Sequence, residues 1–160
     1  MPVEGDAFRE VMGQFPTGVT IVTTRLGDEL HGMTANAIAS VSLQPPLVLV
    51  CIDTAADSHD IVDGAGVFAL NILARDQEEL SWQFAVKEGR SSHALDDVPH
   101  HTGATGAPII DGGVAFLDCR IVQRLPAGDH TIFIGEVVDA ARLSDAEPLV
   151  FHRGAYRTLG

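Results

Sequence analysis

Two long segments in the last third of the chain limit the possible folds most strongly. They read GVAFLDCRIVQRL at 113–125 and HTIFIGEVVDAARL at 130–143, and only the four residues PAGD separate them. So short a connection can join antiparallel neighbours, whereas parallel strands need a crossover of about a dozen residues or more. Both segments also exceed the usual strand length of about 5–6 residues. We therefore expect two long, curved antiparallel strands here.

The rest of the chain contains more strand patterns than helix patterns. The turn LGDEL joins a strand at about 19–24 to a return strand that runs from His31 to Thr34. Pro45 and Pro46 interrupt regular structure before the apolar strand LVLVCI. Further runs typical of strands are FALNIL at 68–73 and LVFHRGAYRTL at 149–159.

Two helices and one short helical piece are predicted. Asp6 is expected to cap a first helix that ends at Pro16 and carries the apolar stripe Phe8, Val11, Met12 and Phe15. Asp76 is expected to cap a second helix, from about Gln77 to Val86, with apolar contacts from Leu80, Trp82 and Phe84. Ser58 is expected to cap the short piece SHDIVDGA.

These elements define a mainly β fold with flanking helices. The count is about six or seven strands and two helices, without regular crossover helices between the strands. An antiparallel barrel with helices outside is favoured over a doubly wound sheet. No repeat or linker divides the chain, so residues 1–160 are expected to form a single domain.

Charge and hydropathy exclude several classes of protein. The formal net charge is -12, and a chain this acidic lacks the basic surface that nucleic acids and anionic membranes require. No run approaches the ~20 apolar residues of a membrane span, and no leader pattern is seen at the start. We expect a cytoplasmic protein in which Cys51 and Cys119 are reduced thiols.

Common catalytic motifs are missing from the sequence. There is no GxGxxG after a strand, no GxxxxGK[ST], no HExxH and no GxSxG. The segment SHALDDVPHH could hold a metal through its histidines and carboxylates, but adjacent histidines in an extended chain point in different directions. A solvated loop is the simpler interpretation, and no metal is predicted. The residues concerned are His93, Asp96, Asp97, His100 and His101.

The stretch GMTANAIASVSLQPPLVLVCID at 32–53 is the best candidate for a binding site. Its small side chains would let a flat or bulky ligand approach the backbone, and its hydroxyl, amide and peptide N–H groups would hold polar or anionic atoms without positive charge. A strand edge of small residues packed under a helix would explain the same composition. Residues alone leave both interpretations open.

Four blocks of sequence, in this order, resemble the flavin reductase-like family. They are FPTGVTIVTT at 15–24, the stretch at 32–53, GDHTIFIGEV at 128–137 and PLVFHRGAYR at 148–157, and GAPIIDGGVAFLDC at 106–119 matches a weaker fifth block. The resemblance covers nearly the whole chain. It implies a split β-barrel that binds flavin and pairs into homodimers.

The resemblance also implies roles for individual residues. His130 would contact the nicotinamide, although a turn histidine held by Asp129 would look the same in sequence. Tyr156 would close the pocket, unless it is a core residue that closes the barrel. The expected flavin-binding residues are Thr34, Ala35, Asn36, Ala37, Ser40, Val41, Ser42, Asp53 and Ser58.

One position departs from the family pattern. Many relatives carry a basic residue followed by Phe after the second helix, and the matching positions here are Ala94 and Leu95. Arg90 or His93 could replace the missing cation at the flavin phosphate. A shifted register of the match would explain the departure equally well. If the cation is missing, flavin is expected to be held loosely.

The activity implied by the resemblance is hydride transfer from NADH or NADPH to FMN or FAD. Reduced flavin would then diffuse to a separate monooxygenase. NADPH would call for a basic pair at its extra phosphate. Arg153 and Arg157 are the candidates, but the sequence does not show where their side chains point, so NADH is favoured. A flavin-binding carrier without reductase activity is the main alternative. A barrel similar to pyridoxamine-phosphate oxidases fits poorly, because those sites use several basic residues and this chain has ten in all. An acidic structural domain would leave the ordered blocks unexplained.

Overall fold

A computed structural model describes residues 1–85 and 95–160, and residues 86–94 are not described. The predictions for Arg90, His93 and Ala94 therefore lie outside the described residues. The described part is mainly β, as expected, and its largest sheet has seven antiparallel strands in the order β3-β2-β6-β9-β10-β5-β4. These strands are β2 (Thr20–Leu26), β3 (Glu29–Ala35), β4 (Ile38–Leu43), β5 (Pro46–Asp53), β6 (Val67–Ile72), β9 (Ala115–Ala127) and β10 (His130–Arg142).

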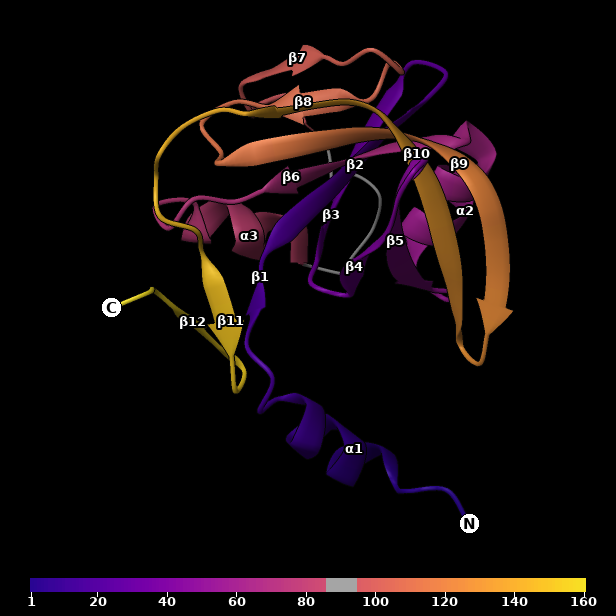
Figure 1. Cartoon of the computed structure of the whole chain (residues 1–160), viewed down its shortest axis with the longest axis vertical. Helices are drawn as coiled ribbons and strands as arrows, with labels where there is room; N and C mark the ends of the chain where they lie inside the picture. Colours follow the sequence, from indigo (N-terminus) through magenta and orange to yellow (C-terminus); the bar gives the residue numbers. More distant parts are fainter. Residues whose placement is uncertain (86–94) are drawn as a thin grey trace.

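The connection between β3 and β4 closes this sheet into a barrel. These two strands lie at opposite edges of the hydrogen-bonded order, yet only Asn36 and Ala37 separate them in sequence. Because a residue spans at most about 3.6 Å, the two edges must come close together, and the sheet has to curl (Figure 1). Between β3 and β4 there is no strand pairing, so the barrel is split at this point.

The long hairpin predicted from 113–143 is confirmed as β9 and β10. Each strand has 13 residues, and the turn lies at Gly128, whose φ of 61° is the left-handed region that favours glycine. The register shifts at Ile134/Gly135 and again at Val137/Asp139. Such bulges increase bending and twist, which explains how two long strands follow the curved barrel wall.

Two small sheets complete the strands. β1 (Thr17–Gly18) pairs with β11 (Val150–His152), which in turn pairs with β12 (Ala155–Arg157). The segment predicted as one strand at 149–159 is therefore a hairpin, because Arg153 and Gly154 both adopt positive φ and turn the chain. β7 (His100–Thr102) and β8 (Pro108–Ile110) form a second pair, so His100 and His101 lie in a strand and not in the expected loop.

All three helical segments are present, but α1 ends at Met12 rather than at Pro16, and the predicted caps of α1 and α2 are wrong. α1 (Gly5–Met12) has Glu4 at its N-cap, and Asp6 lies in the first turn, where it pairs with Arg9 at 3.1 Å. α2 (Asp57–Ala65) has Ala56 at its N-cap, so Ser58 is a helical residue. α3 (Glu78–Ala85) starts one residue later than expected and buries Phe84.

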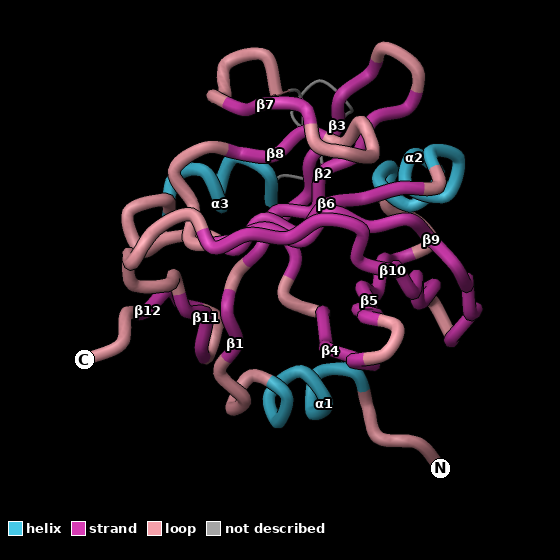
Figure 2. The backbone as a smooth tube through the Cα atoms, turned by 45° about the horizontal axis from the view of Figure 1, so that its top comes forward, coloured by secondary structure: helices cyan, strands magenta, loops and turns pink. Residues whose placement is uncertain are grey.

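The three helices are placed differently around the barrel. α2 and α3 contribute Val62 and Phe84 to two separate apolar clusters of the barrel. α1 lies apart from the main sheet, below β4 in Figure 2, and buries none of its residues. Its end is tied to the β11–β12 turn, because the N–H of Arg153 donates to the carbonyl of Gly13 at 3.0 Å. No helix in the described part of the chain has the length and apolar run needed to cross a membrane.

Candidate functional site

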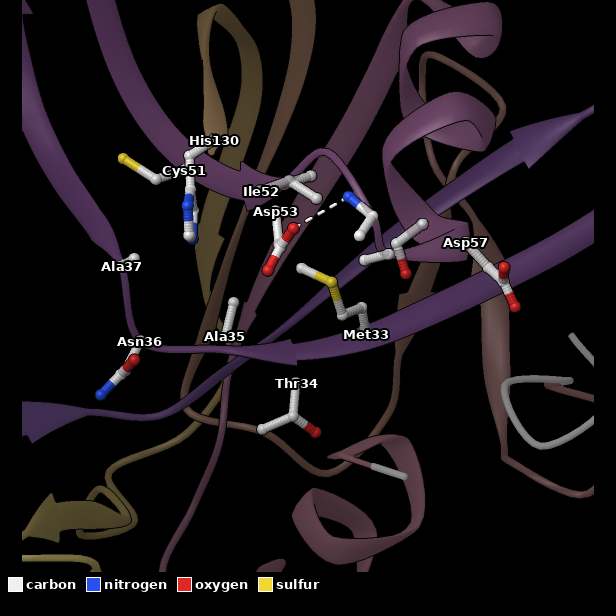
Figure 3. A pocket seen from close by; sticks show the side chains of 13 residues that line it. Met33, Thr34, Ala35, Asn36, Ala37, Cys51, Ile52, Asp53, Asp57 and His130 are labelled. Atoms are coloured by element: carbon white, nitrogen blue, oxygen red, sulfur yellow. Dashed lines mark hydrogen bonds between the residues drawn. The ribbon is translucent and has the colours of Figure 1, made fainter. Parts of the chain in front are cut away.

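A cavity of about 400 Å³ opens where the barrel is split. Its walls are the end of β3, the β3–β4 link, the end of β5, the first turn of α2 and the start of β10 (Figure 3). The volume lies within the range of about 300–1,000 Å³ that is common for small-molecule sites. The cavity brings together these predicted residues: Thr34, Ala35, Asn36, Ala37, Asp53, Ser58 and His130.

Small side chains give this cavity its free space. Ala35 and Ala37 lie on one side, and Ala55 and Ala56 lie at the start of α2. Because none of these side chains extends beyond Cβ, a planar group can approach the backbone closely. The residues present therefore fit a flat ring system. This is the arrangement predicted from the small residues at 34–37.

Some of the predicted polar ligands already have partners within the protein. The Thr34 hydroxyl donates to the carbonyl of Ser81 in α3 at 2.6 Å, and its side chain points toward this helix (Figure 3). Asp53 Oδ1 accepts from the N–H of Ala55 at 2.8 Å, which fixes the turn between β5 and α2. The Asn36 amide donates to the Thr17 hydroxyl at 3.2 Å and keeps its other N–H.

His130 stands at the start of β10 on the opposite wall. Its neighbours fix this position, since the N–H of Thr54 donates to the carbonyl of Asp129 at 2.9 Å, and the ring of His59 contacts the hydroxyl of Thr131 at 2.8 Å. In the β5–β10 register His130 pairs with Asp53. The α2 side of the cavity and the hairpin tip are therefore held together.

The partner of His130 within the protein is Asp129. Nδ1 of His130 and Oδ1 of Asp129 are 2.7 Å apart, and this hydrogen bond lowers the pKa of the Asp129 carboxyl. With Nδ1–H donated to the carboxylate, the neutral ring has its lone pair on Nε2. His130 is thus both the turn histidine held by Asp129 and a residue of the cavity.

Tyr156 lies in an adjoining cavity of about 240 Å³ rather than in the one with His130. Thr34, Ala35 and Asn36 line both cavities, so the β3 end is the wall between them. The Tyr156 hydroxyl is 2.5 Å from that of Ser81, and its ring meets Trp82 edge to face at 5.4 Å. Tyr156 also packs against a barrel cluster, in keeping with the alternative of a core residue.

Three predicted residues do not join this group. Ser40, Val41 and Ser42 lie on the edge strand β4 and line neither cavity. The reason is that the chain passes Ala37 and then runs away from the split along β5. Ser40 and Val41 are exposed, and the register of β4 shifts between Ser40 and Ser42.

Several residues of the cavity wall are not among those predicted from the sequence. Asp57 contributes a second carboxylate, and Cys51 a half-buried thiol whose pKa burial raises. Both lie within the segment 51–58 that carries the predicted Asp53 and Ser58, so spacing along this turn was the available signal. Met33, Ile52, Ala55 and Ala56 also line the wall.

His100 and His101, the two histidines of this segment that the structure describes, bind separate partners, and His93 lies outside the described residues. His100 Nδ1 lies 2.7 Å from the carbonyl of Val98, and His101 pairs with Asp111 at 3.0 Å. Within residues 1–85 and 95–160 no cluster of three or more potential ligands could hold a metal ion.

Cys119 is a buried free thiol, and burial together with the neighbouring Asp118 raises its pKa to about 12.

The Asp129–His130 pair gives a prediction about acid stability. Replacing His130 with Ala should raise the pKa of Asp129 toward its ordinary value of 3.8, because the main cause of the lowered pKa is removed. A lowered folded pKa stabilises the fold above the unfolded pKa, and this contribution is lost as pH falls through the folded pKa. The wild type should thus lose more stability than H130A below about pH 4.

Carboxyl NMR titration of Asp129 measures this pKa directly. H101A is a matched control, because it removes an exposed histidine from another His–Asp pair and should leave the Asp129 titration unchanged. An unchanged Asp129 pKa in H130A would contradict the assigned hydrogen bond.

Comparison with known proteins gives a consistent result. Residues 12–160 match the family model described as flavin reductase like domain. The chain is 43% identical over 154 residues to the NADH-dependent flavin reductase of a Rhodococcus species, covering 94% of this chain and 84% of the relative. It is 36% identical to the reductase component of 4-hydroxyphenylacetate 3-monooxygenase from Thermus thermophilus, covering 96% of each.

A solved structure supports the same assignment. The NADH:FAD oxidoreductase SgcE6 of Streptomyces globisporus, in complex with NAD and FAD fragments, superposes with a TM-score of 0.90. It is 40% identical in sequence and covers 100% of this chain and 97% of its own. The mainly β split barrel, the ordered sequence blocks and these matches agree, and the chain belongs to the flavin reductase-like family.

Proposed function

We propose that the chain catalyses hydride transfer from NADH to FMN or FAD and supplies the reduced flavin to a separate monooxygenase. The observation that carries this proposal is His130 facing a cavity of small residues at the split of the barrel. One named relative is an NADH-dependent flavin reductase, and another is the reductase component of a monooxygenase. Relatives named for FAD and for FMN both occur, so either flavin fits the family.

The chain's own contribution is to align two flat rings. When both are bound, hydride passes from C4 of the nicotinamide to N5 of the flavin, and the cofactors supply this redox chemistry. Ala35 and Ala37 leave room for the flavin ring beside the β3–β4 link. Alignment at about 3–3.5 Å between reacting atoms lowers the barrier without any acid or nucleophile from the protein. The absence of a catalytic triad motif follows from this division of labour.

His130 orients the nicotinamide in this proposal. Asp129 holds the ring through Nδ1, so Nε2 of the neutral imidazole is available as an acceptor. The carboxamide of nicotinamide carries an N–H₂ donor that suits this acceptor. About 41% of the His130 side chain is exposed, so a ligand can reach it.

The charges of the cavity favour release of the flavin. Among the described residues that line it there is no Lys or Arg, while Asp53 and Asp57 are both acidic. An anionic ligand is therefore held by neutral donors and receives no charge-assisted hydrogen bond from these residues. Weak holding suits a flavin that leaves after reduction.

The first test separates a reductase from a carrier. Purified protein should oxidise NADH only when FMN or FAD is added, because the protein has no other electron acceptor in this proposal. The measurement is anaerobic loss of flavin absorbance at 450 nm with each flavin and each nicotinamide. Flavin that binds but stays oxidised with both NADH and NADPH would favour the carrier and refute the reductase.

The second test concerns His130. The H130A variant should raise KM for NADH about five- to tenfold and leave KM for flavin within about twofold, since one hydrogen bond to the nicotinamide is lost. The control is H101A, which removes a surface histidine of another His–Asp pair and should change neither KM. Equal effects of H130A on both substrates, or none, would remove His130 from the nicotinamide site.

We also propose that two copies of the chain form a homodimer through α1. This helix exposes Phe8, Val11 and Met12, which are 60%, 70% and 51% accessible, and Phe15 follows at 67%. An apolar stripe of this size is costly in water and typical of a protein interface. Together with β5 and β11 the stripe borders a hollow of about 560 Å³. The α1 helix of a second copy could pack against this helix and into the hollow.

Substitution in α1 tests the dimer. The F8D variant should shift the protein from dimer to monomer in light scattering coupled to gel filtration, with the dissociation constant raised at least tenfold. The reason is that burying a Phe side chain contributes about 1.5–3 kcal/mol and every 1.4 kcal/mol is tenfold. The control L159D places the same charge at a residue of similar exposure, 58%, and should stay dimeric. A monomeric wild type would refute the proposal.

A further inference from the structure

A buried hydrogen bond lies directly behind the wall of the flavin cavity. His31 on β3 is 1% exposed, Ser58 in the first turn of α2 is 3% exposed, and His31 Nε2 lies 2.7 Å from Ser58 Oγ. Ser58 lines the cavity, whereas His31 does not. Any effect of His31 on a ligand there must therefore pass through its neighbours, and among the residues whose contacts are described Ser58 is the neighbour that lines the cavity.

Side-chain hydrogen-bond donors are scarce at this wall. Asp53 and Asp57 are acceptors when ionised, and the Thr34 hydroxyl is donated to Ser81. The peptide N–H groups of Ala55 and Ala56 are both donated to Asp53. Flavin offers mainly acceptors at its ring carbonyls and phosphate. The Ser58 hydroxyl is consequently one of few side-chain donors available to it among the described residues.

The Ser58 hydroxyl carries only one hydrogen, so the direction of its bond to His31 decides what the cavity receives. If Ser58 donates to His31, it presents lone pairs beside two carboxylates and repels a ligand acceptor. If Nε2–H of His31 donates to Ser58 Oγ, the O–H can turn toward the cavity. Only the second arrangement matches an acceptor-rich ligand.

We propose that His31 is a positioning residue that donates Nε2–H to Ser58 and thereby aims the Ser58 hydroxyl at a flavin oxygen. The inference rests on the proposed function, because the ligand is the flavin. It assigns to a residue outside the cavity a role in flavin affinity. The nicotinamide side, at His130, is not involved.

The experiment is a double-mutant cycle on flavin binding, read by fluorescence titration without NADH. S58A and H31L should each raise the flavin dissociation constant about five- to tenfold, the usual loss for one hydrogen bond. The double variant should bind no more weakly than S58A alone, because His31 acts only through Ser58. Fully additive losses would overturn the proposal.

Two further variants guard against a fold defect. H31Q keeps an N–H about as far from the backbone as Nε2 and should bind flavin nearly as well as the wild type, whereas H31N is too short to reach Ser58 and should behave like H31L. Equal affinities of H31Q and H31N would overturn the proposal even if H31L does not fold.

Thr24→Val is the matched stability control. Thr24 is fully buried, pairs with His31 in the β2–β3 register and donates its hydroxyl to the carbonyl of Val67 at 2.6 Å, away from the cavity. It should lower Tm as the His31 variants do without changing flavin affinity. If H31L also lowers Tm without changing flavin affinity, His31 is merely structural.

Riboflavin and FMN locate the acceptor. If S58A and H31L weaken the binding of FMN only, the acceptor is on the phosphate. If they weaken the binding of both flavins, the acceptor is on the ring. Either result supports the proposal. A wild type that binds neither flavin would refute the proposed function itself, whereas intact wild-type binding with unaffected variants would refute only the role of His31.

Discussion

The two residues Asn36 and Ala37 connect opposite edges of a seven-stranded sheet, and most of the structure depends on this short link. It forces the sheet to curl, and the bulges between β9 and β10 help these long strands to bend with it. It also prevents β3 and β4 from pairing, and the resulting split is where the cavities open. The small side chains near the link therefore serve two purposes: they let the chain cross the split, and they leave space for a ligand.

The sequence predicted those parts of the fold whose signals are local. The hairpin at 113–143 and the turn at Gly27 follow from strand patterns separated by turn residues, and both are confirmed. The helix caps were wrong because any Asp or Ser near a helix start gives the same signal, and only the backbone decides which residue caps it. The strand pattern at 149–159 does not reveal the hairpin at 150–157, because a non-glycine residue, Arg153, takes a positive φ at its turn.

The site was predicted only in part, because composition and spacing are also local signals. Residues 34–37 and 53–58 are close in space because β5 returns beside the link, and the ordered blocks of sequence pointed to both. Ser40 to Ser42 have the same composition but lie past the split, and composition cannot reveal where a strand leaves the site. His31 gave no signal, since a buried histidine on a strand is recognised only by the side chain that it meets.

The shortness of the link has a consequence for protein engineering and for natural variation in length. Extra residues at 36–37 would relax the closure and enlarge the split, so this segment is a poor place for an insertion. The turn at Gly27 and Asp28 is different, because it is exposed and has open space around it. A tag or a second domain spliced into that turn would leave the barrel undisturbed.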